Sequence, residues 1–313
     1  MRVLFLGMGS IGSRHYRLLK NIAPNFEYFA YCRGQRTCPV PGPEELHSWD
    51  DVEKAGIDVA FICNPTSKHV ETAIECAKRG INLFIEKPLS NSLERIDELH
   101  QYIDKYEVKV IVGFNLRFHP IIERIKDIIP SNKNNVLRFS ACCGSYLPGW
   151  RGCDYRKTYS ASAALGGGVI LDLIHELDYC TWIFGQPTSI KGHYGKYSAL
   201  ELDVEDTAEM ILQYPKYLGV IHVDYYRPIP KRMIEIITST SVIEADLLAG
   251  TLSITTCEGT SLERFNTHED TTYLNQLAHV ISVIEGHEKP RTTFEESVGV
   301  LRLALDFKKQ QGE

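Results

Sequence analysis

The sequence has little that would direct it to nucleic acid, to a membrane or to an oxidising compartment. Its 34 lysines and arginines are outnumbered by 40 acidic residues, and the formal net charge of -6 predicts no basic surface for a polyanion. No apolar run approaches membrane-spanning length, and no signal peptide precedes the first predicted strand. We therefore expect a cytoplasmic protein that binds a small molecule, with no nucleic acid and no membrane as partner.

Cysteine patterns that would hold a metal or a disulfide framework are also missing. The nine cysteines include no C-x-x-C pair and no zinc spacing, and Cys142 and Cys143 are adjacent, which is poor geometry for a shared bridge. We interpret them as reduced thiols. Glu201, Asp203, Glu205 and Asp206 form an acidic cluster with no histidine beside it, so we predict a solvated turn there and no metal site anywhere in the chain.

What the sequence does have is a glycine pattern at its start. The apolar run 3–6 has the length of a strand, and helical spacing of apolar residues begins at Ile11. Between them, Gly7 permits a tight turn, Gly9 lets the backbone approach a pyrophosphate, and Gly12 lets the helix pack close to the strand. The helix N-terminus offers unpaired N–H groups to the phosphates. We therefore predict a dinucleotide site that includes Gly7, Gly9, Ser10, Ile11 and Gly12.

Strands and helices then alternate over the first ~115 residues, as in a doubly wound parallel sheet. Apolar strands are predicted at 58–63, 82–85 and 109–114, with a helix beginning at Ser92. Ligands of such sheets lie outside the carboxyl ends of the strands. The polar residues that follow these strands are therefore expected near the cofactor, namely Asn64, Thr66, Glu86, Lys87, Asn115 and Arg117.

The end of the second strand, predicted at 26–31, bears on the choice of cofactor. An NAD-binding fold usually has an acidic residue there for the ribose hydroxyls, whereas this chain has Cys32, Arg33 and Arg36. A guanidinium can form paired, charge-assisted hydrogen bonds with a 2′-phosphate. We therefore predict NADP in preference to NAD, and the alternative is that both arginines are merely solvated loop charges.

The second half of the chain predicts consecutive strands without helices between them, which indicates antiparallel pairing and an α+β domain. A helix is expected at 121–129 that ends at Pro130, and Thr293 and Glu296 form a capping box for a last helix. A large open sheet commonly becomes a subunit interface, so we predict a homodimer or homotetramer. The predicted strands are 136–142, 208–214, 218–224, 233–238, 242–245 and 252–256.

These motifs together resemble the Gfo/Idh/MocA oxidoreductases, typified by glucose-fructose oxidoreductase and inositol 2-dehydrogenase. The resemblance rests on the glycine turn, on Asn64-Pro65 with His69 following, on Glu86-Lys87-Pro88, on the stretch 113–120, and on Gly166-Gly167-Gly168 with Asp172, His175 and Asp178. It implies an NAD(P)-binding Rossmann domain at 1–118, a substrate-binding and oligomerisation domain at 119–313, and Pro65 and His69 as further cofactor-binding residues.

Lys87, Asp172 and His175 are the predicted catalytic residues. Oxidation of an alcohol needs a hydride acceptor, a base for the hydroxyl proton and a positive group for the developing alkoxide. An imidazole suits the base and an ammonium the positive group. We assign His175 as acid/base, Lys87 as electrostatic partner and proton relay, and Asp172 as the group that binds a substrate hydroxyl or orients the imidazole. Asp172 and His175 are three residues apart on one predicted helix, where relatives have four, so which of them is the acid/base stays open.

The loop at 149–159 is predicted to bind the substrate. Trp150 and Tyr159 can stack on a sugar ring, while Arg151, Arg156 and Lys157 can hold a carboxylate or a phosphate. The alternative is a surface loop that closes over a sheet edge. The resemblance implies an NAD(P)-dependent oxidoreductase acting on a hydroxyl of a sugar, nucleotide sugar or sugar acid, as in branches that act on bacterial surface sugars. The alternatives are an epimerase or elimination-type glycosidase with recycled NAD, and a non-catalytic sensor.

Overall fold

The computed structural model describes residues 1–33, 37–132, 135–268 and 270–310. The chain forms two compact units, and each is composed of separate segments. The first contains Met1–Asn115 and Thr272–Leu301, and the second contains Leu116–Thr271 and Arg302–Glu313. The sequence predicted one boundary after residue 118. The structure differs because the segment from Thr272 returns to the first unit.

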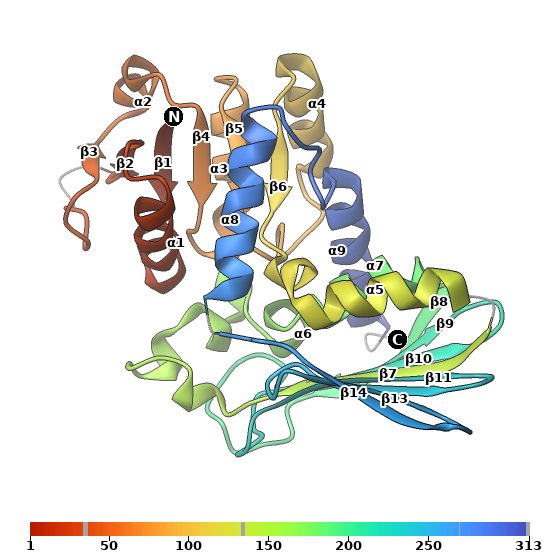
Figure 1. The fold of residues 1–313 in the computed structure, drawn as a ribbon. Helices are drawn as coiled ribbons and strands as arrows, with labels where there is room; N and C mark the ends of the chain where they lie inside the picture. The colour runs from red at the N-terminus through yellow and green to blue at the C-terminus, as the bar shows by residue number, and fades with distance from the viewer. Residues whose placement is uncertain (34–36, 133–134, 269, 311–313) are drawn as a thin grey trace. The chain divides into compact units, whose positions relative to one another are not determined.

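The first unit is built on a parallel sheet of six strands in the order β3-β2-β1-β4-β5-β6 (Figure 1). The order reverses beside β1, which creates the switch point of a doubly wound fold and confirms the predicted α/β class. The strands pair in parallel throughout. They are β1 (Arg2–Leu6), β2 (Glu27–Tyr31), β3 (Glu44–Leu46), β4 (Val59–Ile62), β5 (Asn82–Ile85) and β6 (Val110–Val112).

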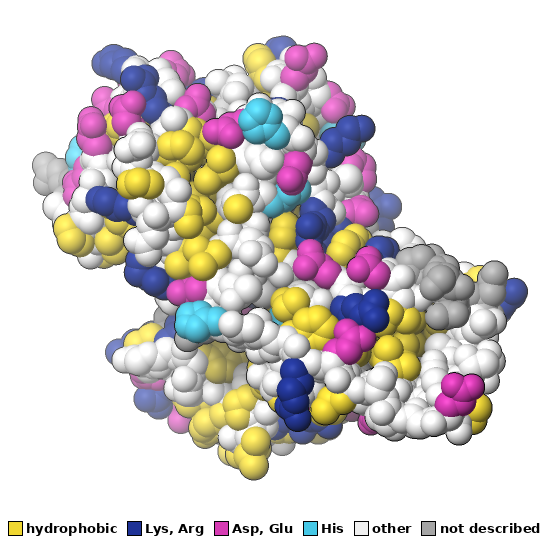
Figure 2. Space-filling view, viewed as in Figure 1, with side chains coloured by type: hydrophobic (Ala, Val, Ile, Leu, Met, Phe, Trp, Pro, Cys, Tyr) yellow, Lys and Arg dark blue, Asp and Glu magenta, His cyan; other side chains and the backbone are white. Residues whose placement is uncertain are grey.

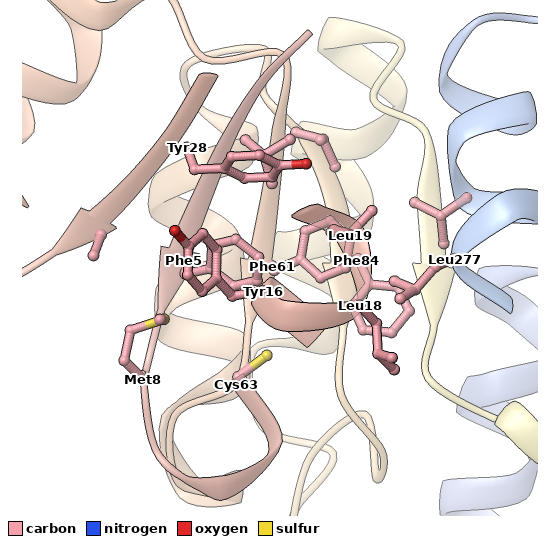
Figure 3. Close-up of a cluster of buried hydrophobic side chains, with 14 of the residues drawn as sticks. Phe5, Met8, Tyr16, Leu18, Leu19, Tyr28, Phe61, Cys63, Phe84 and Leu277 are labelled. Atoms are coloured by element: carbon pink, nitrogen blue, oxygen red, sulfur yellow. The ribbon is translucent and has the colours of Figure 1, made fainter. Parts of the chain in front are cut away.

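Helices of this unit bury apolar stripes against the sheet. The rings of Phe5, Phe61 and Phe84 come from three neighbouring strands and lie side by side in the core, with Leu277 of α8 packed into the same cluster (Figure 3). The Phe61 and Phe84 rings stack with their centroids 4.6 Å apart. The helices are α1 (Ser10–Ile22), α2 (Trp49–Ala55), α3 (His69–Ala77), α4 (Ile96–Tyr106), α8 (Thr271–Ile284) and the first half of α9 (Phe294–Lys309), with the 3-10 turn η1 (Thr66–Lys68) before α3.

The second unit is built on one wide sheet of eight strands in the order β14-β13-β12-β11-β7-β10-β9-β8. All neighbours pair antiparallel except β7 and β10, so the prediction of a mainly antiparallel α+β unit is confirmed. The strands are β7 (Val136–Gly144), β8 (Ser189–Gly195), β9 (Thr207–Gln213), β10 (Leu218–Asp224), β11 (Lys231–Thr238), β12 (Val242–Asp246), β13 (Thr251–Thr256) and β14 (Gly259–Arg264).

One face of this sheet carries the core of the second unit. Alternate residues such as Phe139, Ile221 and Ile236 are buried there, and Phe139 stacks on Phe184 of α7 with 4.0 Å between the ring centroids. Helices α5 (Pro120–Asn132), α6 (Val169–Asp172) and α7 (His175–Phe184) lie on that face, and no described helix of this unit lies on the other (Figure 1). The end of α9 packs against β8, where the Phe307 and Tyr194 ring centroids are 5.6 Å apart.

Two helix boundaries differ from the sequence prediction. Helix α4 begins at Ile96 and not at Ser92, because Arg95 before it takes the left-handed conformation with a φ of 61°. Helix α5 continues through Pro130 to Asn132 instead of ending at the proline. The capping box is confirmed, since the backbone N–H of Glu296 donates to Thr293 Oγ1 and that of Thr293 donates to the Glu296 carboxylate.

Surface charge is mixed, and no described helix fits a membrane. Figure 2 shows lysine and arginine side chains interspersed with aspartate and glutamate over the visible face. Among the described residues, none of the helices combines the length and the apolar character that crossing a bilayer would need. All nine cysteines are free thiols.

Candidate functional site

The glycine turn joins β1 directly to α1 and leaves space where a phosphate would lie. Gly7 has a φ of +106°, and a Cβ there would lie 2.5 Å from the backbone nitrogen of Asn64. A Cβ on Gly12 would lie 2.0 Å from the carbonyl oxygen of Gly7. A Cβ on Gly9, in contrast, would meet nothing within 4 Å. Two glycines are therefore required by packing, while the third keeps the approach to the helix open.

The first turn of α1 is also chemically suited to an anion. Its N-cap is Gly9, which provides no side-chain cap, and the first turn contains no acidic residue. Helix α2 of the same unit is instead closed by a capping box between Ser48 and Asp51. The N–H groups at the start of α1 therefore remain for a ligand, and the positive end of the helix dipole favours a pyrophosphate. These residues fit a nicotinamide dinucleotide.

After β2, a buried Cys32 stands where an NAD-binding fold usually has an acidic residue. Burial raises the pKa of its thiol, so the side chain is neutral and provides no carboxylate for ribose hydroxyls. Arg33 follows in an exposed position. Arg36 lies outside the described residues.

His69 ties together two of the loops that were predicted to surround the cofactor. Its ring is almost fully buried, with Nε2 lying 2.9 Å from the carbonyl oxygen of Asn64 and Nδ1 lying 2.9 Å from that of Pro88. The Asn64 side chain donates to Thr72 Oγ1 at 2.8 Å, and Thr66 is buried in η1. These contacts occupy the ring of His69 with backbone atoms, so its geometry favours bracing of the loops over direct contact with the cofactor.

Glu86, Lys87 and Pro88 follow β5, as the sequence predicts. The Glu86 carboxylate is buried, with Oε1 lying 2.6 Å from His15 Nε2 and Oε2 accepting from the backbone N–H of Lys87 at 3.1 Å. Lys87 itself is half-buried. The carboxylate is thus committed to its own unit, which argues against the direct cofactor contact predicted for Glu86.

Asn115 and Arg117 were predicted to lie near the cofactor, but they belong to different units. Asn115 is buried and donates to Thr272 Oγ1 at 2.9 Å within the first unit. Arg117 is 1% exposed in the second unit, where its Nη2 and the Asp178 Oδ1 lie 2.7 Å apart. The Arg117 guanidinium is buried and committed to this carboxylate, so the structure does not support Arg117 as a cofactor-binding residue.

Asp172 and His175 lie on two helices and not on one, which corrects the prediction. Helix α6 ends at Asp172, Leu173 leaves helical geometry with a φ of -99° and a ψ of 31°, and α7 begins at His175. Both side chains are buried in the second unit. The expectation that the pair shares one helical face therefore does not hold, because the helix is interrupted between them.

The carboxylate of Asp172 accepts hydrogen bonds from two tyrosines. Tyr159 Oη donates to Oδ1 at 2.6 Å, and Tyr225 Oη donates to Oδ2 at 2.8 Å. Burial, and then the neighbouring carboxylate, raises the pKa of Tyr225 well above its usual value, so its hydroxyl stays protonated and donates. Hydrogen bonds to both oxygens stabilise the ionised carboxylate and fix its orientation.

The glycine triplet 166–168 before α6 lets the backbone of Tyr159 pack close to the start of this helix. A Cβ on Gly167 would lie 2.2 Å from the carbonyl oxygen of Tyr159, and one on Gly168 would lie 2.4 Å from Glu205 Oε1. Gly168 also has a φ of +108°, which a side chain would strain. The triplet therefore lets the tyrosine-bearing loop and a buried glutamate pack against the start of α6.

The predicted substrate loop divides into a half-buried part, with Trp150 and Arg151, and an exposed part, with Arg156 and Lys157. Trp150 packs edge-on against Tyr225 with 5.3 Å between ring centroids, and its Nε1 donates to Ser145 Oγ at 2.7 Å. The Arg151 guanidinium lies 5.1 Å from the centroid of the Tyr159 ring. Trp150 and Arg151 are thus the two residues of the loop that lie against the tyrosines on Asp172.

The remaining basic residues of the loop, Arg156 and Lys157, are exposed, and Arg156 is already paired with carboxylates. Arg156 is paired with Asp154 at 2.8 Å and with Glu201 at 3.3 Å, and these carboxylates raise its pKa. Lys157 is exposed. The predicted roles of Arg156 and Lys157 in holding a substrate anion therefore receive no support from the geometry, whereas Arg151 is compatible with that role.

The acidic cluster at 201–206 is only partly the solvated turn that the sequence predicted, because Glu201 and Asp203 are exposed whereas Glu205 and Asp206 are buried. Glu205 is buried and pairs with Lys308 at 2.9 Å. Asp206 is fully buried and accepts hydrogen bonds from the N–H groups of Tyr197 and Ser198 at 2.9 Å. Glu205 and Asp206 therefore anchor segments of the second unit. The part of the chain that the structure describes has no group of three or more His, Cys, Asp or Glu side chains arranged to bind a metal ion.

Two residues of the site were missed by sequence reasoning. His15 looked like one more residue of the buried stripe of α1, and its partner Glu86 is 71 residues away. Tyr225 follows β10 without any motif, and its partner Asp172 is 53 residues away. Neither contact has a local sequence signal, because both depend on the tertiary fold.

Comparison with known proteins identifies the family. Residues 1–114 match the family model of the Gfo/Idh/MocA oxidoreductase family, NAD-binding Rossmann fold. Residues 134–244 match the family model of the Gfo/Idh/MocA C-terminal domain. The two models thus cover the glycine turn, the Glu86-Lys87-Pro88 segment and the stretch with Asp172 and His175.

Known relatives and structures agree along the whole chain. A myo-inositol 2-dehydrogenase of Thermotoga maritima is 28% identical over 100% of this chain and 97% of its own length. A scyllo-inositol 2-dehydrogenase (NAD(+)) of Bacillus subtilis is 28% identical over 62% of this chain and 57% of its own. The crystal structure of GenD2 from gentamicin A biosynthesis, in complex with NAD, superposes with a TM-score of 0.84 at 19% identity, covering 100% of this chain and 94% of that one. The chain belongs to the Gfo/Idh/MocA family and is an NAD(P)-dependent oxidoreductase.

Proposed function

We propose that this protein interconverts a secondary alcohol and a ketone on a sugar-like ring, with a nicotinamide dinucleotide as the hydride carrier. The observation that carries the proposal is the uncapped first turn of α1 behind Gly9, which fits a pyrophosphate. Two of the relatives are inositol 2-dehydrogenases, whose substrates are polyhydroxylated rings. The dinucleotide, when bound, accepts or returns the hydride.

The roles of the protein's own side chains follow from the chemistry of an alcohol. His175 takes the hydroxyl proton as general base and returns it in the reverse direction. The Lys87 ammonium stabilises negative charge on the substrate oxygen and relays the proton. Both Asp172 oxygens already accept tyrosine hydroxyls, so we assign Asp172 to orientation of the imidazole or of a substrate hydroxyl and not to proton abstraction.

We further propose that the substrate carries an anionic group, as a sugar acid or a nucleotide sugar does. Arg151 is half-buried, and its guanidinium donates to the neutral Ser160 hydroxyl at 3.2 Å and lies 5.1 Å from the centroid of the Tyr159 ring. Arg156 on the same loop is neutralised by two carboxylates. A guanidinium held over Tyr159, with no carboxylate partner among the described residues, suits a carboxylate or phosphate of the substrate.

The preference for NADP over NAD is part of the same proposal. A neutral Cys32 followed by the exposed Arg33 removes the acceptor that selects NAD and supplies a donor for a 2′-phosphate. We also propose that the protein acts in the cytoplasm, where its nine free thiols stay reduced.

The first experiment is a titration of the purified protein with NADPH and NADH, followed by fluorescence, on the wild type and on Arg33→Ala. We expect NADPH to bind about tenfold more tightly and the difference to disappear in the variant. Equal binding of both would remove the NADP preference and leave the oxidoreductase. Failure of both to bind would overturn the proposed function.

Turnover then tests the substrate class. Inositols, neutral sugars, sugar acids and nucleotide sugars are offered with oxidised cofactor, and the absorbance of the reduced form is followed. We expect sugar acids or nucleotide sugars to be oxidised, with Arg151→Ala raising KM and His175→Asn lowering kcat. Conversion of substrate without net change in cofactor absorbance would favour an epimerase or an elimination-type glycosidase. Cofactor binding without any conversion would favour a sensor.

A further inference from the structure

A buried contact between His15 and Glu86 connects the helix behind the glycine turn with the segment that carries Lys87. His15 of α1 is 0% exposed and its Nε2 lies 2.6 Å from Glu86 Oε1. The imidazole is enclosed by the aromatic rings of Phe61, Phe84 and Tyr273, with centroids 5.8, 5.0 and 5.7 Å away. A carboxylate in such surroundings is costly unless a partner compensates it, so the geometry of the pair is strongly determined.

The other oxygen of Glu86 fixes the backbone of Lys87. Oε2 accepts from the Lys87 N–H at 3.1 Å. Gly113 at the end of β6 makes room for the carboxylate, since a Cβ there would lie 3.1 Å from Glu86 Oε1 and 3.2 Å from Oε2. Movement of the Glu86 carboxylate would therefore shift the backbone of Lys87.

A second histidine holds the far side of the same segment. His69 Nδ1 lies 2.9 Å from the carbonyl oxygen of Pro88, directly after Lys87, and His69 Nε2 lies 2.9 Å from that of Asn64. Lys87 thus stands between two anchors from helices α1 and α3. His15 differs from His69 in two ways. It acts on Lys87 through the side chain of Glu86, and it lies on α1, the helix whose first turn fits the pyrophosphate.

We propose that His15 is a positioning residue that acts through Glu86 on Lys87, and that it links the cofactor-binding turn to the lysine that stabilises the substrate oxygen. The role of Lys87 in this statement rests on the proposed function. His15 Nδ1 is buried and has no hydrogen-bond partner among the described residues, so the imidazole is retained although it leaves one nitrogen unsatisfied. A residue present only for packing would be better served here by phenylalanine, which matches the surrounding rings.

The test measures Lys87 directly and does not need a known substrate. Acetic anhydride labels unprotonated lysine amines, and mass spectrometry of the Lys87 peptide as a function of pH gives the labelling rate and its midpoint. The variants are His15→Phe, which removes the contact, and His15→Gln, whose amide can reach the same oxygen. The control is His279→Gln, since His279 is also mostly buried in the first unit and also bonded to a carboxylate, Glu288, at 2.6 Å.

We expect His15→Phe to change the labelling rate of Lys87 by about threefold or to move its midpoint by about half a pH unit. His15→Gln is expected to restore most of the wild-type behaviour, and His279→Gln to leave Lys87 unchanged even where it lowers the melting temperature. Glu86→Gln provides the same test should His15→Phe fail to fold, because it keeps the volume and alters the pair.

Labelling of Lys87 that is unchanged in folded His15→Phe or Glu86→Gln would overturn the inference, and so would an equal change in His279→Gln. A failure of the proposed function looks different. In that case neither nucleotide binds and no sugar is converted, while the dependence of Lys87 labelling on His15 is still measured and still decides the positioning role.

Discussion

Buried histidines are the residues whose charge state most directly links this structure to pH. His119 of the second unit is buried, and burial lowers its pKa from 6.5 to about 4, with the nearby Arg232 acting in the same direction. Its Nδ1 accepts from the Ile121 N–H at 3.3 Å, so the folded protein holds the neutral imidazole. The unfolded chain binds the proton more readily than the folded chain does.

His119 therefore makes the protein less stable at acid pH. Because the folded pKa lies below the unfolded one, the contribution of His119 to stability is complete above about pH 6.5 and is lost as the pH falls toward 4. Between pH 7.5 and pH 5 this group removes about 2 kcal/mol from the free energy of unfolding. His119→Gln should lose less stability over that interval than the wild type in urea titrations at the two values. An exposed control, His287→Gln, should follow the wild type, and a His119 variant that does the same contradicts the assignment.

Each oxygen of Asp172 accepts a hydrogen bond from one tyrosine hydroxyl, so we expect the loss of one hydroxyl to weaken the site. Tyr225→Phe keeps the ring that packs against Trp150 and removes only the donor to Oδ2. A hydrogen bond to a charged group contributes about 2 kcal/mol, so we expect a loss of that size in the free energy of unfolding and a lower kcat. Denaturant titration and turnover measure the two. Tyr226→Phe is the control, since Tyr226 Oη donates to Thr207 Oγ1 and not to Asp172. Equal stability and turnover in both variants would exclude the proposed role of the tyrosines.

Single residues were predictable from the sequence only where a local motif marks them. Lys87 and the three glycines of the first turn lie where the motif placed them, at the end of β5 and between β1 and α1. His15 and Tyr225 have no such mark, since each gains its meaning from a partner on another element. Glu205 and Asp206 were misjudged because charge alone suggested solvent, whereas Lys308 and backbone N–H groups pair with them in the interior.

Among the elements, the glycine turn between β1 and α1 contains one glycine that packing requires, Gly12, and one that we expect to serve cofactor binding, Gly9. Gly12→Ala places a Cβ 2.0 Å from the Gly7 carbonyl oxygen, and overpacking of this kind costs about 1 to 3 kcal/mol of stability. Gly9→Ala meets no atom within 4 Å and Gly9 has a φ of -74°, so the fold accepts it. We expect Gly9→Ala to keep its melting temperature and to bind NADH about tenfold more weakly. Thermal unfolding and fluorescence titration measure both effects, and a Gly9→Ala protein that binds as tightly as the wild type contradicts the phosphate site.

Elements were predicted well where the hydrophobic period is clear. The strand at 82–85 was placed at its observed bounds, and the strands at 58–63 and 218–224 were found. Strands β8 and β14 were missed because they lie at the two edges of the wide sheet and carry polar residues, with β14 exposed over nearly its whole length. The interruption between α6 and α7 was missed because the apolar pattern from Val169 to Leu177 runs on without a breaking residue.

For the whole molecule, the sequence predicted two architectures correctly but divided the chain too simply. Nothing in the stretch from Thr272 indicates that α8 packs against the first sheet, where Leu277, Val280 and Val283 join the core around Phe84. A chain that returns to an earlier unit does so through tertiary packing, and the periodicity of a helix reports only that one face is buried. The order of elements is therefore readable, while their assignment to units is not.

The uncovered face of the eight-stranded sheet bears on the assembly, and we keep the proposal that copies of this chain associate through it. Ile211 of β9 is 44% exposed there, and its cross-strand neighbours on the same face are Lys191 of β8 and Val220 of β10. A two-fold axis through such a face would bury Ile211 and Val220 against the same residues of another copy.

This arrangement predicts how assembly fails. Sedimentation velocity should show the wild type as a dimer or tetramer of the 35.5 kDa chain, and Ile211→Lys should shift it toward the monomer, since an ammonium is then buried beside Lys191. Ile229→Lys is the matched control, because Ile229 is 79% exposed and lies outside the strands of the sheet. A monomeric wild type refutes the association, and an oligomer that survives Ile211→Lys as well as Ile229→Lys means that the copies meet on another surface.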